Sequence, residues 1–244
     1  MLTVYGMDAA VLEGLASMAA IAANGTAMAA VAGNALLMHA ITNSETAMQA
    51  ISRSQTAMQR IANSTTAMDA ISGSKIARGA VQASPYYNSY IKENDMAIAK
   101  LVVGFANLAS AGYSGCAGMA ADSTAMTAVA ASATAMGKIA AVDAALSKLA
   151  ASTTAMDALY ARKKQMKGGS ASKSGKFIIL EISQSNAFNT SKYGYATLSD
   201  GSKPDWSSYL AKYAFFQKYP KYATYMLNDT DSDDYIYYFD IASP

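Results

Sequence analysis

The chain has 244 residues, of which 52% are hydrophobic and 15% are charged, so it can bury a core and divide into more than one unit. Its formal net charge of +2 is too small to favour nucleic acid as a partner. One cysteine and one histidine exclude an internal disulfide and leave too few ligands for a zinc site or a histidine-based triad.

The N-terminal region, residues 1–83, repeats a phrase of ten residues. Writing the chain in tens aligns a methionine in successive rows with an Ile or Val three residues later, as in TAMQAI, TAMQRI and TAMDAI. The pattern returns in residues 116–167. A fixed period of this kind indicates stacked supersecondary units. The residues expected to form the repeat core are Met28, Ile41, Met48, Ile51, Met58, Ile61, Met68, Ile71, Met126, Met136 and Met156.

Within one repeat, the phrase T-A-M-x-A-I predicts a helix rather than a strand. On a helix the Ala, Met and Ile side chains share an arc of roughly 160°, whereas on a strand the often charged variable position would share the face of Ala and Ile. Ten residues displace the stripe by roughly 80° per repeat, and Ser, Asn and Gly runs separate the repeats. We therefore predict two-turn helices that restart every ten residues. We expect capping boxes at Thr46, Thr56, Thr66 and Thr154, each followed three residues later by Gln or Asp.

Helices of this length are not stable alone, so packing against neighbours must hold them. Ala and Met allow close approach and fill irregular gaps. Two arrangements fit the sequence: one chain folded as a thin solenoid, or several identical chains wound around an axis. Each repeat offers only four modest apolar groups, and burial of a methylene contributes about 0.8 kcal/mol, which favours oligomerisation.

Residues 84–115 interrupt the period. The stretch IKENDMAIAKLVVGFANLAS predicts one longer amphipathic helix that redirects the array. The longest apolar run, near LVVGFA, is too short to cross a bilayer, so we expect no membrane insertion. The N-terminal stretch lacks the basic leader of a signal peptide. The expected buried face of the helix is Ile91, Met96, Ile98, Leu101, Val102 and Phe105.

Residues 168–176, GGSASKSGK, have the composition of a flexible linker. Beyond them, residues 177–244 predict a small α+β domain with FIILEIS as a strand, YGYATLSDGS as a hairpin arm, DWSSYLAKYAFFQKY as a helix and DDYIYYFDI as a terminal strand. This domain holds the single tryptophan and ten of the sixteen tyrosines. The sequence thus predicts a mainly α fold of short stacked helices, forming a solenoid or an oligomeric spacer, followed by a Tyr-rich interaction domain.

Aromatic side chains are the candidate binding residues of this domain, because Tyr and Trp supply large, partly polar contact surfaces with little rotamer entropy to lose. Packing within a small domain is the alternative role. The candidates are Tyr193, Tyr195, Trp206, Tyr209, Tyr213 and Tyr222.

Acidic residues give two weaker candidates. Asp229, Asp231 and Asp233 alternate as in a calcium loop, but the Gly and the closing Glu of an EF-hand are missing, so a solvated acidic turn is favoured. Asp205, Glu181 and Asp240 supply carboxylates of the kind used in glycoside cleavage, yet nothing in their spacing favours this. We expect no enzymatic activity, no cofactor and no bound metal.

The units NGTAMAAVAGN, SETAMQAIS, SQTAMQRIAN, STTAMDAIS, DSTAMTAVAAS and SATAMGKIAAV resemble the TAM-type decapeptide repeats of tailed-bacteriophage tail fibre and virion structural proteins. The similarity covers both arrays, more than half of the chain. It implies a non-enzymatic virion component, assembled in the host cytoplasm, such as a tail fibre, whisker, collar or connector.

The same resemblance implies the partners. These are other virion proteins, further copies of the chain, for which a trimer is our guess, and a host surface glycan or protein contacted by the C-terminal domain. A carbohydrate-binding adhesin that uses the C-terminal Tyr and Trp residues is the alternative function.

Overall fold

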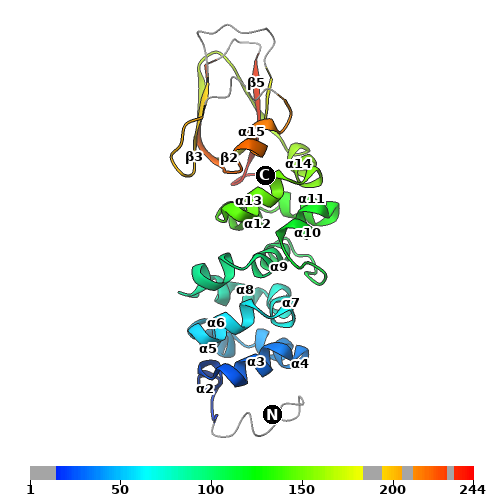
Figure 1. Cartoon of the computed structure of the whole chain (residues 1–244), viewed down its shortest axis with the longest axis vertical. Helices are drawn as coiled ribbons and strands as arrows, with labels where there is room; N and C mark the ends of the chain where they lie inside the picture. Colours follow the sequence, from blue (N-terminus) through cyan, green and yellow to red (C-terminus); the bar gives the residue numbers. More distant parts are fainter. Residues whose placement is uncertain (1–14, 184–193, 205–210, 230–233) are drawn as a thin grey trace. The chain divides into compact units, whose positions relative to one another are not determined.

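The computed structural model describes residues 15–183, 194–204, 211–229 and 234–244. The chain divides into two compact units, residues 1–119 and residues 120–244. Short helices make up the first unit, and short helices followed by an antiparallel sheet make up the second (Figure 1). The predicted fold class, helical repeats followed by a small α+β region, is confirmed at this level.

The helices of the first unit restart with the period of the sequence. From α3 to α8, each begins ten residues after the one before, as the pattern predicted. The elements are α2 (Met18–Ala23), α3 (Gly25–Gly33), α4 (Ala35–Thr42), α5 (Glu45–Ser52), α6 (Gln55–Ala62), α7 (Thr65–Gly73), α8 (Lys75–Gln82), the π-helix η2 (Tyr87–Lys92) and α9 (Asp95–Phe105).

Serine and asparagine cap these helices, so the capping boxes predicted at Thr46, Thr56, Thr66 and Thr154 are wrong. The Ser64 hydroxyl, for example, accepts a hydrogen bond from the Ala67 amide at 3.1 Å. An N-cap residue needs extended backbone angles to aim its oxygen at that amide, and Ser64 has φ −107° and ψ 116°. Thr66 lies two residues later, already inside α7, where this geometry is not available.

Each helix packs against the third helix before it. Helix α5 contacts α2, α6 contacts α3, α7 contacts α4, and α8 contacts α5. Residues about thirty apart are therefore neighbours. The same spacing recurs in hydrogen bonds that we call serine bridges, in which a capping serine donates to a backbone carbonyl 32 residues earlier. They join Ser54 to Ala22 at 2.7 Å, Ser64 to Ala32 at 2.5 Å, Ser74 to Thr42 at 2.6 Å, Ser84 to Ser52 at 2.6 Å and, in the second unit, Ser152 to Ala120 at 2.6 Å.

The serine bridges explain why serine recurs with the repeat. Each helix leaves unpaired amides at its start and unpaired carbonyls at its end. The Ser64 oxygen accepts from an amide at the start of α7, and its proton goes to the carbonyl of Ala32 in the last turn of α3. One hydroxyl thus satisfies two helix ends, and each hydrogen bond contributes about 1 kcal/mol.

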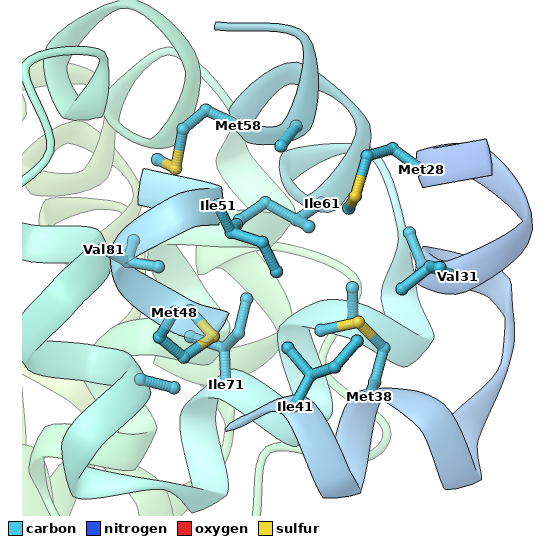
Figure 2. Close-up of a cluster of buried hydrophobic side chains, with 14 of the residues drawn as sticks. Met28, Val31, Met38, Ile41, Met48, Ile51, Met58, Ile61, Ile71 and Val81 are labelled. Carbon is cyan, nitrogen blue, oxygen red and sulfur yellow. The ribbon is translucent and has the colours of Figure 1, made fainter. Parts of the chain in front are cut away.

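The apolar side chains of the repeats fill one interior. Figure 2 shows Met and Ile side chains from successive helices of the first unit pointing toward one another. Every member of the predicted repeat core is buried, most with no exposed surface. Because the apolar stripe is already buried within one chain, the shortage of apolar surface that favoured oligomerisation does not arise here. Oligomerisation itself stays a prediction.

Residues 84–105 continue the repeat, so the predicted single interrupting helix is wrong. The segment forms two helices, η2 and α9, separated at Glu93 and Asn94, and the Asn94 side chain caps α9 by accepting from the Ala97 amide at 3.0 Å. Helix η2 contacts α6, and α9 contacts α7. Asn94 falls ten residues after Ser84, so the capping period persists while the Met pattern fades.

Helix α9 also buries a lysine that the sequence pattern does not single out. Lys100 is 1% exposed, and its ammonium lies 2.6 Å from the Asp69 carboxylate and 3.0 Å from the Ser110 carbonyl. The Ser110 hydroxyl donates to the same carboxylate oxygen at 2.7 Å. A buried charge is tolerated only when it is paired and hydrogen-bonded, and this network provides both.

The second unit joins four repeat helices to a sheet. The helices are α11 (Ser123–Ala130), α12 (Ala133–Ala140), α13 (Asp143–Ala150) and α14 (Thr153–Tyr160), preceded by α10 (Cys116–Ala121), which spans the boundary between the units. The sheet contains β1 (Lys164–Lys167), β2 (Ala171–Ser183), β3 (Tyr195–Leu198), β4 (Ala223–Asn228) and β5 (Tyr235–Asp240) in the order β1-β5-β2-β4-β3, with α15 (Ala214–Lys218). All strand pairs are antiparallel.

The predicted linker 168–176 is wrong from Ala171 onward. Residues 171–174 pair with β4, as part of a β2 that extends to Ser183. Met166, which the periodicity assigned to the second array, lies in β1 opposite Ile236. The small polar residues of GGSASKSGK fit a strand here because the partner strand supplies the hydrogen bonds, and composition alone does not report this.

The remaining predictions for the C-terminal domain are confirmed in part. The predicted strands appear as β2, β3 and β5, and Gly201 follows Asp200 at a turn with φ +83°. Of the predicted helix, the structure contains the short α15, while residues 205–210 lie outside the described part. The second array and the sheet belong to one compact unit rather than to separate domains.

Candidate binding surface on the C-terminal sheet

One face of the sheet carries an ordered set of polar and aromatic side chains. Successive residues of a strand point to opposite faces, so Tyr235 and Tyr237 share one face of β5 and Ile236 lies on the other. Strand β1 places Lys167 and Gln165 opposite these tyrosines, and β2 places Ser183 and Glu181 opposite them on the other side. The result is two rows, Lys167–Tyr235–Ser183 and Gln165–Tyr237–Glu181, which we call the tyrosine grid.

The two tyrosines at the centre of the grid have nearly parallel rings. Their ring centroids lie 6.3 Å apart with an interplanar angle of 21°, a stacked arrangement. Both rings are partly exposed, and Gln165 and Lys167 beside them are exposed. Donors and acceptors therefore border an aromatic centre that solvent can reach.

The grid is the exposed continuation of a buried face. Phe239 follows Tyr237 by two residues and pairs with Ile178 of β2, so both share the face of the tyrosines. Neither has exposed surface. Helix α14 contacts β5 within this unit. The opposite face of the sheet carries the core of Met166, Ile182, Ile236 and their neighbours. The tyrosine grid therefore projects from a strand that is packed on its other side.

Tyr160, the last residue of α14, fixes one edge of the grid. Its hydroxyl donates to the Glu181 carboxylate at 2.5 Å, and its ring lies 6.3 Å from that of Tyr237. The hydrogen bond, followed by burial, raises the pKa of Tyr160 to about 12. The Lys163 ammonium lies 4.1 Å from the Tyr160 ring and 5.7 Å from the Tyr237 ring. These contacts hold Glu181 and Tyr237 in place.

A second group of contacts joins α14 to the segment before α15. The Tyr213 hydroxyl donates to Asp157 at 2.5 Å, and the Lys212 ammonium lies 3.3 Å from the same carboxylate. These two hydrogen bonds lower the pKa of Asp157. Lys212 also lies 4.2 Å from the Tyr160 ring, on which two ammonium groups thus converge. Such cation–π contacts contribute about 0.5–1 kcal/mol at exposed sites.

The predicted binding tyrosines do not form one patch among the residues that the structure describes. Tyr195 packs against Tyr225 at 5.8 Å with the Lys203 ammonium 5.6 Å from its ring, while Tyr222 lies under Lys176. Tyr213 is buried and held by Asp157. Tyr193, Trp206 and Tyr209 lie outside the described residues.

The acidic candidates are also dispersed. Asp229 accepts a hydrogen bond from Ser170, while Asp231 and Asp233 lie outside the described residues. Glu181 is bonded to Tyr160 and Asp240 to Lys164, and Asp205 is not described. Within the described ranges, no group of three or more His, Cys, Asp or Glu side chains is placed to hold a metal ion.

The sequence contains a signal for the tyrosine grid, although Tyr235 and Tyr237 were not among the predicted binding residues. The terminal strand DDYIYYFDI alternates tyrosine with buried residues, which marks Tyr235 and Tyr237 as one face. The partners on β1 carried no such signal, because residues 164–167 read as the end of the helical array. Only strand pairing places Gln165 and Lys167 beside the tyrosines.

Comparison with protein-family models gives no match, and comparison with curated protein sequences also gives none. Among the described residues, no single helix is long and apolar enough to cross a membrane. Helices α3 and α4 taken together have the length and apolar composition of a membrane span, but the two helices are bent by 97° relative to each other.

Proposed function

We propose that this chain is a non-enzymatic structural component of a phage virion, such as a tail fibre, whisker, collar or connector. Its helical repeats act as a spacer, and its C-terminal sheet region attaches to a host receptor or to another virion protein. The observation that carries the spacer role is the recurrence of the serine bridge at one separation, 32 residues, in both units.

A single-chain solenoid with three helices per turn accounts for this recurrence. If each turn takes about thirty residues, a helix rests on the third helix before it and the capping serine meets the same carbonyl position in the turn below. Such arrays gain or lose length by whole repeats without changing the contacts of the remaining ones. That property suits a protein whose role is to set a distance.

The attachment role rests on the difference between the two kinds of surface. The described array helices expose mainly Ala, Ser, Thr, Gln and isolated charges, whereas the sheet exposes stacked tyrosines bordered by polar groups. Tyrosine surfaces of this kind favour protein and ligand contacts. The adhesin alternative has less support, because the aromatic residues first assigned to it lie in separate places.

Particle composition tests the proposal. Virions assembled from a genome that carries this gene should contain the chain at a fixed copy number by quantitative mass spectrometry. Particles from a genome lacking the gene should show defective assembly or defective host adsorption. A chain absent from purified particles would refute the virion role and leave a free repeat protein.

The oligomeric state is a separate test. The resemblance predicts further copies of the chain as partners. The apolar side chains of the repeats are buried within one chain and do not require further copies. Multi-angle light scattering of the full chain, at concentrations around its expression level, decides between a trimer and a monomer. A stable monomer would exclude a homotrimeric fibre but not a connector or collar piece.

A further inference from the structure

We propose that residues 5–12 are the first repeat of the array and dock in an apolar groove at its N-terminal edge. The groove has a volume of about 320 Å³. Its apolar walls include Met18 and Ile21 of α2, Leu37 and Ile41 of α4, and Ala47 of α5. Residues 5–12 lie outside the described part of the chain, a few positions before α2. The inference concerns how the array is closed at this edge and does not depend on the virion role.

The walls of the groove identify its occupant as a helix one place before α2. In the described array, α2 contacts α3, α5 and α6, and α3 contacts α4, α6 and α7. A helix therefore touches the next, the third and the fourth helix after it. The groove is walled by α2, α4 and α5, which stand in these three relations to a helix that precedes α2. The period of ten places that helix at residues 5–12.

The side chains of the groove are less covered than their counterparts one repeat later. Ile41 is 5% exposed, whereas Ile51 has no exposed surface. Met18 is partly exposed, whereas Met28 is buried. Among the described residues, this edge of the array therefore has apolar surface that one more helix would cover.

Leu36 adds an independent mark of the occupant. It is one of two large apolar side chains that the described residues expose, and 67% of its surface is open. Two repeats later the same position is Thr56, whose methyl group would lie 3.7 Å from a Cβ placed on Gly25. Moving both positions back by two repeats pairs Leu36 with Tyr5. The exposed leucine thus lies where the tyrosine of the docked segment would pack and remove apolar surface from water.

Ser44, at the rim of the groove, sets the register of the docked segment. It caps α5 by accepting from the Ala47 amide at 3.3 Å, as the other capping serines do. In each serine bridge the hydroxyl also donates to a carbonyl 32 residues earlier, and the position 32 residues before Ser44 is Leu12. The hydroxyl and the contact pattern of the helices therefore point to the same residues.

In this register, three of the four core positions of the segment are apolar. Met7, Val11 and Leu12 fall where later repeats bury apolar or small residues, while Asp8 falls where they have methionine. A carboxylate at such a position costs free energy, so we expect the segment to open more readily than later repeats. Terminal repeats of solenoids are commonly atypical in this way.

Hydrogen–deuterium exchange of the full chain, read by mass spectrometry, tests the docking. Amides that take part in packed helices exchange slowly because they must open first. The amides of residues 9–12 should therefore exchange at least tenfold more slowly in the full chain than in a synthetic peptide of residues 1–14. Val11→Asp should remove this protection, while the C-terminal sheet keeps its wild-type exchange.

Asp8→Met makes the segment more like the later repeats and should slow the exchange of residues 9–12 by about a further tenfold, which corresponds to about 1.4 kcal/mol. The matched control is Glu13→Met, the same kind of change at the third position of a repeat. The equivalent residues Asn43 and Arg53 are exposed, so this variant should leave the exchange unchanged.

The register has its own pair of variants. Ser44→Ala removes the hydroxyl at the groove and should speed the exchange of residues 9–12 several-fold. Ser64→Ala removes the equivalent cap and bridge two repeats later and should leave residues 9–12 unchanged. Loss of a cap is common to both variants, so the difference between them reports the bond to the segment.

Three results would overturn the inference. The first is exchange of residues 9–12 at the rate of the free peptide, and the second is an equal effect of Asp8→Met and Glu13→Met. The third is protection that rises with protein concentration in step with the molecular mass from light scattering. That result would place the segment in the groove of a second copy.

Discussion

The helical array of the first unit and the sheet of the second unit reach a packed core by different routes. In the array, each helix from α5 onward packs against the third helix before it, and a serine or asparagine cap recurs every ten residues. In the sheet, β1 pairs with a strand about seventy residues away along the chain. The strand pairings do not follow a repeating sequence separation. Repetition makes the array tolerant of changes by whole units, whereas the sheet depends on each of its pairings.

Deletion by whole repeats should give the largest contrast. Removing residues 35–64 takes out α4 to α6, leaves Asn34 to cap α7, and retains the pair of Asp69 with Lys100. We expect a cooperative unfolding transition and an unchanged helix content per residue by circular dichroism. Removing residues 35–59 instead shifts the register by half a repeat.

The off-register deletion should lose most of the helical signal of the first unit, because caps and apolar stripes no longer meet their partners. Equal behaviour of the two deletions would contradict the thirty-residue stacking rule. No comparable deletion in the sheet region should be tolerated.

Loss of the carboxylate that pairs with the buried Lys100 should be the largest single-residue effect. Asp69→Ala leaves the Lys100 ammonium buried without a carboxylate, and breaking such pairs costs about 3–5 kcal/mol. Urea denaturation measures this as a lower midpoint at an unchanged slope. Lys100→Met together with Asp69→Ala should recover much of the loss.

The matched control for the ion pair is Asp143→Ala, which removes an exposed partner of Lys221 in the second unit. Exposed pairs contribute about 0–1 kcal/mol, so the change should be small. A destabilisation similar to that of Asp69→Ala would argue against burial as the cause.

Truncation of the methionine stripe should come next. Met58 has no exposed surface, and Met→Ala changes in cores cost about 2–5 kcal/mol. Met58→Leu, which conserves volume, should cost less than about 1.5 kcal/mol. Thermal and urea unfolding should rank the two variants in that order, and the reverse order would show that methionine has a role beyond filling space.

Substitutions at one serine bridge test whether serine, as observed, or threonine, as predicted, caps the helix. Ser64→Ala removes the cap of α7 and the bond to Ala32, for an expected loss of about 2 kcal/mol. Thr66→Ala changes a partly exposed residue inside the helix and should stay within about 0.5 kcal/mol. A larger effect at Thr66 would restore the capping-box interpretation.

Alkaline titration compares one tyrosine from each unit and should give the smallest effect. Burial raises the pKa of Tyr87 to about 12, and the bond to Glu181 is the main cause of a similar rise at Tyr160. A raised folded-state pKa gives stability that is complete below the unfolded pKa near 10 and is lost as the pH rises through about 12.

Ultraviolet absorbance of tyrosinate should therefore show late-titrating tyrosines in the folded protein, among them Tyr87, Tyr160 and Tyr213, whose pKa burial also raises. Tyr160→Phe and Tyr87→Phe should each remove one of them. If Glu181→Gln leaves the titration of Tyr160 unchanged, the hydrogen bond is not the cause of its shift.

Prediction from sequence succeeded for the period of the helices and failed for their caps and for the segment in which the Met pattern fades. The restart of a helix every ten residues and the buried Met and Ile positions followed from the period alone. The threonine caps failed because the pattern does not report which residue has extended backbone angles. Residues 84–115 were assigned to one interrupting helix because the Met signal fades there, although Asn94 keeps the capping period.

For the C-terminal site, the sequence predicted the residue type, tyrosine, but not which tyrosines lie together. Tyrosines were expected to form a surface, but Tyr195, Tyr213 and Tyr222 lie in three different surroundings, while the stacked pair is Tyr235 and Tyr237. Composition counts aromatic residues and cannot tell which of them share a sheet face.

The sequence by itself determined the length of the helices, their apolar stripe and the presence of a Tyr-rich α+β region, because these depend on residues fewer than ten positions apart. The tertiary structure decided that each helix rests on the third one before it, that serine hydroxyls join helix ends 32 residues apart, and that β1 completes the tyrosine grid. The reason is that hydrogen-bond partners and burial at these distances depend on how the chain closes on itself, which no local pattern encodes.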